Sequence, residues 1–234
     1  MDDHGHSRCE NCIIRQMNSL KALKKEELKR MSDNKETKVI KKGEVIFKEG
    51  ERLGGVFCVR NGISKLSKIS DNGRDQIVKL AKKGEVLGQR SVIASEATNL
   101  SATALEDMEV CFIPKTYIEE PLQTNPIFTN AVLKQMSTDL KFADDTIVNM
   151  AQKTVRQRLA ETLMYLEDNF GVDAEGYLYL QLSRADIADV VGTATELLIR
   201  TLTKFKKEGL ISTEGKRIKL ENKKALYTIV EGLE

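Results

Sequence analysis

Between residues 37 and 114, short apolar runs alternate with polar residues and with turns that contain glycine. Runs this short have the length of β-strands rather than of helices. Several short strands at this spacing predict an all-β sandwich or barrel. The predicted strands are 45–47, 56–59, 63–69, 77–80 and 110–113, and the glycines between them include Gly43, Gly50, Gly62, Gly84 and Gly88.

Apolar residues at helical spacing flank this β region on both sides. An amphipathic helix is expected at 19–32, and Pro121 and Pro126 mark a boundary before a long helix from 127 to beyond 150. The rest of the chain predicts a small helical domain that ends in a hairpin with Glu214-Gly215 as its turn. Its elements are a helix at 155–170, a strand at 177–182, helices at 184–191 and 195–207, and the hairpin at 211–218.

The long predicted helix carries one narrow apolar seam. Apolar residues step along it by 3, 4, 3, 4 and 3 positions, as the a and d positions of a coiled coil do. A helix that packs under a β domain usually carries a wider stripe. We therefore favour a helix that pairs with its copy in a homodimer over a core helix. The seam consists of Leu133, Met136, Leu140, Ala143, Ile147 and Met150.

Residues 184–200 have the pattern of a helix-turn-helix. Small Ala188 allows two helices to approach closely, and Gly192 supplies the turn between them. Leu198 is placed to pack the second helix on the first. This pattern predicts that the N-terminal residues of the second helix meet base edges in the major groove of DNA.

One face of the second helix carries the candidate base contacts. Thr195 is the expected N-cap, with Thr193 as the competitor. Glu196 and Arg200 share one helix face, where they form either a surface ion pair of little energetic value or a pair that recognises one G·C base pair. Nearby basic charge favours DNA contact. Between 200 and 219, seven basic residues stand against two acidic ones: Arg200, Lys204, Lys206, Lys207, Lys216, Arg217 and Lys219.

Composition narrows the class of protein. The chain has 234 residues, of which 41% are hydrophobic and 31% charged, with a net charge of +2; this describes a soluble globular protein of one or two domains. No apolar run has the length of a membrane helix, and the first residues lack the apolar segment of a secretory signal. We therefore expect a cytoplasmic protein with no membrane partner. Aromatic residues are only 5% of the chain, which argues against base stacking as the main means of binding.

Patterns of catalytic residues are missing. The two histidines, His4 and His6, both lie near the N-terminus, which argues against histidine acid–base catalysis in a core site. The segment 209–216 approaches a phosphate-binding loop but has one residue too many, and Arg217 stands where that loop has serine or threonine. We therefore expect that the protein is not an enzyme.

The chain resembles the CRP/FNR family of bacterial transcription regulators over nearly its whole length. The matching segments are 42–50, 56–62, 84–88, the long helix, 156–160, the helix-turn-helix and 209–211. The resemblance implies an α+β fold with an N-terminal cyclic-nucleotide-binding-like β jelly roll, a long dimerisation helix and a C-terminal winged helix-turn-helix. The expected domains are an N-terminal segment with a CxxC motif and a short helix at 1–36, a β-roll sensor at 37–125, the dimerisation helix at 126–152 and the DNA-binding domain at 153–234.

By similarity, Glu196 and Arg200 match the residues with which this family recognises bases. Thr195 stands where catabolite-activator-like members have another arginine, and Ile199 stands where FNR-like members have a serine. The resemblance implies a homodimer that binds a near-palindromic double-stranded DNA site containing a G-A step, with different outer bases, and that contacts RNA polymerase. The expected DNA contacts are Thr195, Glu196, Ile199, Arg200, Lys204, Lys216 and Arg217.

Two substitutions distinguish the β-roll from that of cAMP-binding members. Those members hold the ribose and phosphate with a glutamate and an arginine, and the matching positions are Gln89 and Asn99. Without the arginine a cyclic phosphate loses a charge-assisted contact, so cAMP is not expected. Arg90 is placed to serve an altered pocket, and a module that binds an unidentified small molecule is the alternative function. The candidate effector pocket consists of Gly88, Gln89, Arg90, Asn99 and Ser101.

The four cysteines suggest a second kind of signal. FNR-like oxygen sensors hold a [4Fe–4S] cluster with three N-terminal cysteines and one in the β-roll. By similarity, Cys9, Cys12 and Cys111 match three of these positions, and the third N-terminal position falls at Asn18. The remaining candidates for a fourth ligand are His4, His6 and Cys58.

Other roles for these cysteines stay open at this point. Cys58 lies in the middle of a predicted strand, where a small buried hydrophobic role is the first expectation. A lone CxxC also fits zinc, a redox pair or no ligand at all.

The seam also bears on the signal. FNR-like sensors place an aspartate on the seam of the long helix, where like charges oppose pairing, and the matching residue here is Ala143. The seam from Leu133 to Met150 carries no charge. We therefore expect this protein to form a dimer with or without its signal.

Overall fold

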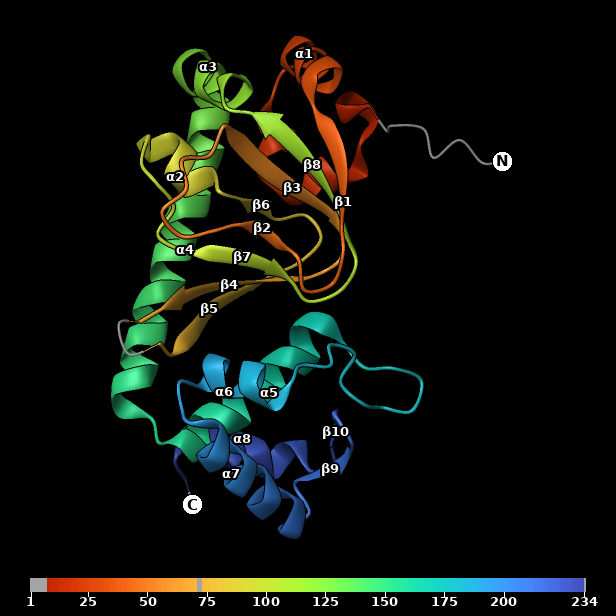
Figure 1. Cartoon of the computed structure of the whole chain (residues 1–234), viewed down its shortest axis with the longest axis vertical. Helices are drawn as coiled ribbons and strands as arrows, with labels where there is room; N and C mark the ends of the chain where they lie inside the picture. The colour runs from red at the N-terminus through yellow and green to blue at the C-terminus, as the bar shows by residue number, and fades with distance from the viewer. Residues whose placement is uncertain (1–7, 71–72, 234) are drawn as a thin grey trace. The chain divides into compact units, whose positions relative to one another are not determined.

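The computed structural model describes residues 8–70 and 73–233, which divide into two compact units (Figure 1). The first contains residues 8–68 and 78–141, and the second contains residues 142–233 and the described part of 69–77. Mixed sheets and helices confirm the predicted α+β class. Within the described residues, no helix is long and apolar enough to cross a lipid bilayer.

The first unit is built on two four-stranded sheets, with strand orders β1-β8-β3-β6 and β2-β7-β4-β5. Apolar side chains from both sheets share one core, in which the rings of Phe57 and Phe47 lie 5.9 Å apart. The predicted β-sandwich is confirmed. The strands are β1 Glu36–Ile40, β2 Val45–Phe47, β3 Gly55–Asn61, β4 Ser64–Ile69, β5 Asp75–Ala81, β6 Val86–Leu87, β7 Ser101–Ala104 and β8 Met108–Pro114.

Short helices precede the β-roll: η1 (Cys9–Asn11), η2 (Ile13–Met17), η3 (Ser19–Ala22) and α1 (Lys25–Asn34). The expected single helix at 19–32 is therefore wrong in its first part. The Glu27 carboxylate accepts a hydrogen bond from Lys24 N at 2.6 Å, which caps α1 and sets its start. Figure 1 shows this segment against the sheet that contains β1, β8 and β3. Its buried side chains Leu20, Leu23, Leu28 and Met31 share a core with Val56 and Ile113 of that sheet.

Three further helices complete the first unit or begin in it: α2 (Gln89–Ala94), α3 (Thr116–Thr124) and α4 (Pro126–Gln152). Pro126 is the first residue of α4, where its missing N–H costs nothing. Asn125 caps this end, because its side-chain oxygen accepts from Phe128 N at 3.2 Å. Pro121, expected at a boundary, instead lies inside α3. Phe128 and Val132 fasten the start of α4 to the core of this unit.

The second unit is a helical domain with a hairpin. Its helices are α5 (Val155–Phe170), α6 (Arg184–Val191), α7 (Thr195–Lys207) and α8 (Lys223–Glu231). The predicted helices at 155–170, 184–191 and 195–207 are confirmed. Their inward faces form the core, with these side chains at most 1% exposed: Leu159, Leu163, Leu166, Ile187, Leu198, Phe205 and Leu226.

Two details of this unit differ from the sequence-based expectations. The strand expected at 177–182 is reduced to isolated bridges, Tyr177 to Lys219 and Leu178 to Val172, because no continuous partner strand runs beside it. The hairpin consists of β9 (Ile211–Glu214) and β10 (Arg217–Leu220), and Arg217 pairs with Glu214. Its turn is therefore Gly215-Lys216 rather than Glu214-Gly215, with Gly215 at a φ of 55°.

Candidate DNA-binding surface and thiol cavity

The helix-turn-helix forms as its sequence pattern predicts. Ser183 caps α6, since its hydroxyl accepts from Asp186 N at 3.0 Å. Gly192 ends α6 in a left-handed conformation, with a φ of 70°, that a side chain would strain. Ala188 and Leu198 are fully buried, as expected for residues where the helices of this unit pack closely. The N-cap of α7 is Ala194, which has no capping side chain; Thr195 is the first helical residue, so neither Thr195 nor Thr193 caps the helix.

Helix α7 separates an apolar inner face from a polar outer face. Leu198 and Leu202 are buried, whereas Glu196 and Arg200 are exposed and Ile199 is 47% exposed. Among the described residues, no salt bridge joins Glu196 to Arg200. Both side chains are therefore open to a ligand.

An arginine on α5 holds the turn between α6 and α7. Arg158 Nε donates to Val191 O at 2.8 Å, and its Nη2 donates to Gly192 O at 3.2 Å. Its Nη1 donates to Lys153 O at 2.7 Å. These bonds satisfy carbonyls at the ends of α4 and α6 that their own helices leave open. The sequence argument missed this role, although the match of segment 156–160 to the family was the available signal.

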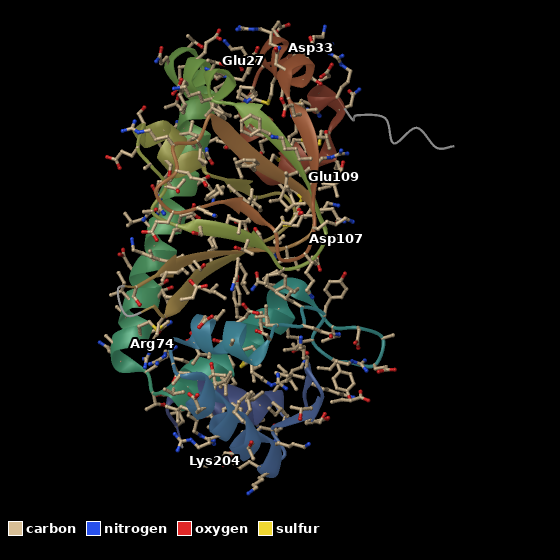
Figure 2. The ribbon with its side chains drawn as sticks, viewed as in Figure 1. Glu27, Asp33, Arg74, Asp107, Glu109 and Lys204 are labelled. Atoms are coloured by element: carbon tan, nitrogen blue, oxygen red, sulfur yellow. The ribbon has the colours of Figure 1, made fainter. Side chains whose placement is uncertain are left out.

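The hairpin presents two basic residues in different states. Lys216 in the hairpin turn is exposed, as is Lys204 on α7, which is labelled in Figure 2. Arg217 instead donates to Asp173 at 2.9 Å and to Glu175 at 2.5 Å, and its guanidinium lies 4.0 Å from the centre of the Tyr177 ring.

The pKa shifts of Arg217 and Asp173 agree with this ion pairing. The hydrogen bond from Arg217 holds the pKa of the Asp173 carboxyl below its usual value, and the two carboxylates raise the pKa of Arg217. Most of the charge of Arg217 is therefore balanced within the protein. A second guanidinium, on Arg184, donates to Gly215 O at 2.9 Å and fastens the hairpin turn.

The candidate effector residues lie near α2. Gly88 has a φ of 78°, and a Cβ there would stand 2.5 Å from a Leu53 methyl group. Gln89 is 7% exposed at the start of α2. Arg90 Nη2 donates to Asn99 Oδ1 at 2.7 Å, so these two residues already pair with each other.

The last candidate effector residue, Ser101, already has a backbone hydrogen-bond partner. The Ser101 hydroxyl accepts from Glu49 N at 3.0 Å.

All four cysteines line one cavity of about 20 Å³ in the first unit. Cys9 and Cys12 come from the N-terminal segment, and Cys58 and Cys111 face each other directly across the β3–β8 pairing. All four are free thiols, and Cys12 is the most exposed of them. Burial raises the pKa of the Cys58 thiol to about 12, and it also raises the pKa of Cys9.

The lining of the cavity fits an anionic group. Arg15, Lys35 and Arg60 contribute cations, and none of the lining residues is acidic. Arg15 Nε is buried without a hydrogen-bond partner. Within residues 8–70 and 73–233, however, no three His, Cys, Asp or Glu side chains are placed to hold a metal ion as the chain stands. His4 and His6, the candidate histidine ligands, lie outside the described residues.

A helix-turn-helix followed by a β-hairpin wing, preceded in the chain by a β-roll, defines a class of DNA-binding regulators. Comparison with known families agrees. Residues 37–125 match the cyclic nucleotide-binding domain, and residues 157–229 match the Crp-like helix-turn-helix domain.

Curated relatives extend the match to most of the chain. It is 32% identical over 196 residues to the transcriptional activator protein anr of Pseudomonas aeruginosa, covering 82% of this chain and 80% of that one. It is 28% identical over 226 residues to the anaerobic regulatory protein of Haemophilus influenzae, covering 94% and 87%. The chain belongs to the CRP/FNR family and is a DNA-binding transcription regulator of that type.

A solved structure supports the fold. A putative transcriptional regulator of the crp/fnr family from Eubacterium rectale superposes with a TM-score of 0.77 at 22% identity, covering 90% of this chain and 96% of that one. The cyclic-nucleotide-binding-like β-roll and winged helix-turn-helix expected from the sequence are thus confirmed as folds.

Proposed function

We propose that the protein binds a near-palindromic DNA site as a homodimer, with α7 in the major groove of each half-site. The observation that carries this proposal is the pair Glu196 and Arg200, both exposed and unpaired on the outer face of α7. Arg200 can donate two hydrogen bonds to guanine, and Glu196 can accept one from cytosine N4. A G-A step in each half-site, as implied by the family, supplies such a base pair. Two half-sites would lie roughly 34 Å apart.

The other candidate contacts take different roles in this proposal. Thr195 and Ile199 would border the recognised base pair on α7, where they set the preference for outer bases. Lys204 and Lys216 are exposed cations that would meet phosphates. Arg217, balanced by Asp173 and Glu175, would act mainly by holding the wing in place.

The exposed face of α4 supports pairing of two copies. Leu133 is 58% exposed, Leu140 64% and Ile147 67%, and Ala143 lies between them. Such large apolar side chains at heptad spacing are costly to leave in water and fit a partner helix. Met136 packs partly on the core of the first unit, and Met150 lies against Gly192, so these two seam residues contribute less.

The signal proposed for this dimer is redox or oxygen, through an iron–sulfur cluster held by Cys9, Cys12 and Cys111. One relative bears the name anaerobic regulatory protein, and the convergence of these thiols on one cavity with a cationic lining supports the same chemistry. When bound, the cluster would supply a redox-active, oxygen-labile group. The chain would hold it by three thiolates, balance its negative charge with Arg15, Lys35 and Arg60, and screen it from solvent with the N-terminal segment.

The β-roll pocket gives the second candidate signal. The match to a cyclic nucleotide-binding domain supports a ligand there, but neutral Gln89 and Asn99 offer no charge for a cyclic phosphate, so cAMP is not proposed. RNA polymerase is a proposed partner on the ground of family membership alone.

Binding of a labelled duplex with two symmetric half-sites tests the DNA proposal. Arg200→Ala should lose about 1–3 kcal/mol on the preferred duplex and lose preference at one base pair. The matched control, Lys204→Ala, should weaken binding to all duplexes about equally. A uniform loss in Arg200→Ala would instead make Arg200 a phosphate contact and contradict the proposal.

A further inference from the structure

The position that lacks the expected cysteine lies beside another thiol. Asn18, at the end of η2, donates from Nδ2 to Gly84 O at 2.8 Å and lies 3.7 Å from Cys58 Sγ. The residue in place of the third N-terminal cysteine therefore touches the one cysteine that the family pattern does not account for. We infer that Cys58 supplies the fourth thiolate of a [4Fe–4S] cluster, together with Cys9, Cys12 and Cys111. This inference rests on the iron–sulfur part of the proposed function.

Sheet register explains why Cys58 is available. β3 and β8 pair in antiparallel fashion, with Cys58 opposite Cys111. Directly opposed residues of such a pair have side chains on the same face of the sheet. Both sulfurs therefore point toward the N-terminal segment that carries Cys9 and Cys12, and all four line the same cavity. Four cysteine thiolates are the usual ligand set of a [4Fe–4S] cluster.

One buried nitrogen of a partly exposed arginine provides an independent reason for an anionic ligand. Arg15 Nε lines this cavity without a hydrogen-bond partner. A buried donor without an acceptor costs free energy, and cluster sulfurs accept hydrogen bonds. Arg60 also lines the cavity and pairs at 2.5 Å with Glu109, which is labelled in Figure 2 and lies outside the lining.

Cluster binding requires the N-terminal segment to move. A cavity of about 20 Å³ has room for roughly one water molecule, and the thiols as they stand do not form a site for a single ion. η1 (Cys9–Asn11) is a single short turn that few hydrogen bonds hold: Cys9 N donates to Ser32 Oγ at 3.1 Å, and Arg15 Nη2 donates to Glu10 O at 3.2 Å. Transfer of a preformed cluster from the thiolates of a carrier breaks four Fe–S bonds on that carrier and forms four with the free thiols of this chain. The four thiol protons pass to the released carrier thiolates or to solvent. Outward movement of η1 would thus accompany cluster binding.

The test measures iron, acid-labile sulfide and visible absorption per chain in the full-length protein, prepared without oxygen. The wild type should hold a near-stoichiometric cluster. Cys58→Ala should lower all three signals about tenfold or more, since even outer partners of metal ligands carry that much affinity. Val56→Ala is the matched control: it truncates a fully buried side chain of the same strand, which shares a core with Cys58, and it should keep the cluster.

Restoration in a double variant tests the position directly. Asn18→Cys in the Cys58→Ala background should regain most of the cluster, because residue 18 already lies beside the Cys58 sulfur. Wild-type cluster content in Cys58→Ala, equal loss in Val56→Ala, or no recovery in the double variant would each overturn the role of Cys58. Wild-type protein that contains no iron, or only zinc, would overturn the iron–sulfur proposal itself and this inference with it. Specific DNA binding by Glu196 and Arg200 would stand in either case.

Discussion

The two units of the chain carry their functional side chains in opposite places. In the second unit, Glu196 and Arg200 stand on the outer face of α7, while Leu198 and Phe205 form the core beneath. In the first unit, the thiols are themselves part of a core, and Cys58 is only 6% exposed. Binding and stability should therefore separate in the second unit, since different residues serve each. In the first unit the same side chains serve both, so a lost ligand is also a lost packing contact.

The largest loss of stability is expected when a core side chain of α7 is truncated. Phe205 is fully buried on the inner face of α7. Phe205→Ala should destabilise this unit by about 3–5 kcal/mol through lost burial and a cavity, and should abolish DNA binding. Calorimetric unfolding measures the loss. Ile199→Ala, at a 47% exposed position of the same helix, should stay within about 0.5 kcal/mol of wild type. Similar losses of unfolding free energy in both variants would contradict the distinction between the inner and outer faces of α7.

The next largest loss of stability is expected at Arg158, which holds the turn before α7. Arg158 donates to Val191 O, Gly192 O and Lys153 O. Arg158→Leu should cost about 2–3 kcal/mol, because hydrogen bonds from a charged donor are lost and the carbonyls stay unpaired.

Arg158→Lys is the matched control for charge. A lysine keeps the cation but cannot reach separate carbonyls with a planar fork. It should recover only part of the stability in chemical denaturation. Full recovery would show that charge alone matters at this position.

A smaller effect is expected at the face of α4. Leu140 is 64% exposed. If it packs against a partner helix, Leu140→Glu should raise the dimer dissociation constant by about tenfold or more, because burial of a leucine is lost and a charge enters the seam. Sedimentation velocity at micromolar concentration measures this change. Thr138→Glu adds the same charge to an exposed position off the seam and should leave the dimer intact. Wild-type protein that sediments as a monomer would contradict the assignment of the seam.

The same comparison explains what could be predicted from the sequence. Helical periodicity placed α5, α6 and α7 correctly, because a surface helix repeats its apolar positions locally. It could not place short β7 (Ser101–Ala104), whose small and polar residues carry no apolar signal and which exists only because β2 and β4 pair with it.

The position of Cys58 beside Cys111 also could not be predicted, because it depends on the register of two strands that are distant in sequence. Cys58 and Cys111 are far apart in sequence and meet only through the β3–β8 pairing. A cysteine inside an apolar run looked like a small hydrophobic residue. Similarly, nothing local in the sequence indicates that Arg217 pairs with Asp173 rather than with phosphate.

The smallest expected effect separates the two basic residues of the wing. Lys216 is exposed, whereas Arg217 is balanced by Asp173 and Glu175. Each cation that meets a phosphate lowers the slope of log affinity against log salt by about 0.9. Lys216→Ala should therefore flatten this slope by about one unit, and Arg217→Ala should leave it nearly unchanged while slightly weakening binding through a looser wing. Fluorescence anisotropy across a salt series measures both slopes. An equal change in the two variants would mean that Arg217 leaves its carboxylates when DNA binds, and the wing would then contact DNA through both side chains.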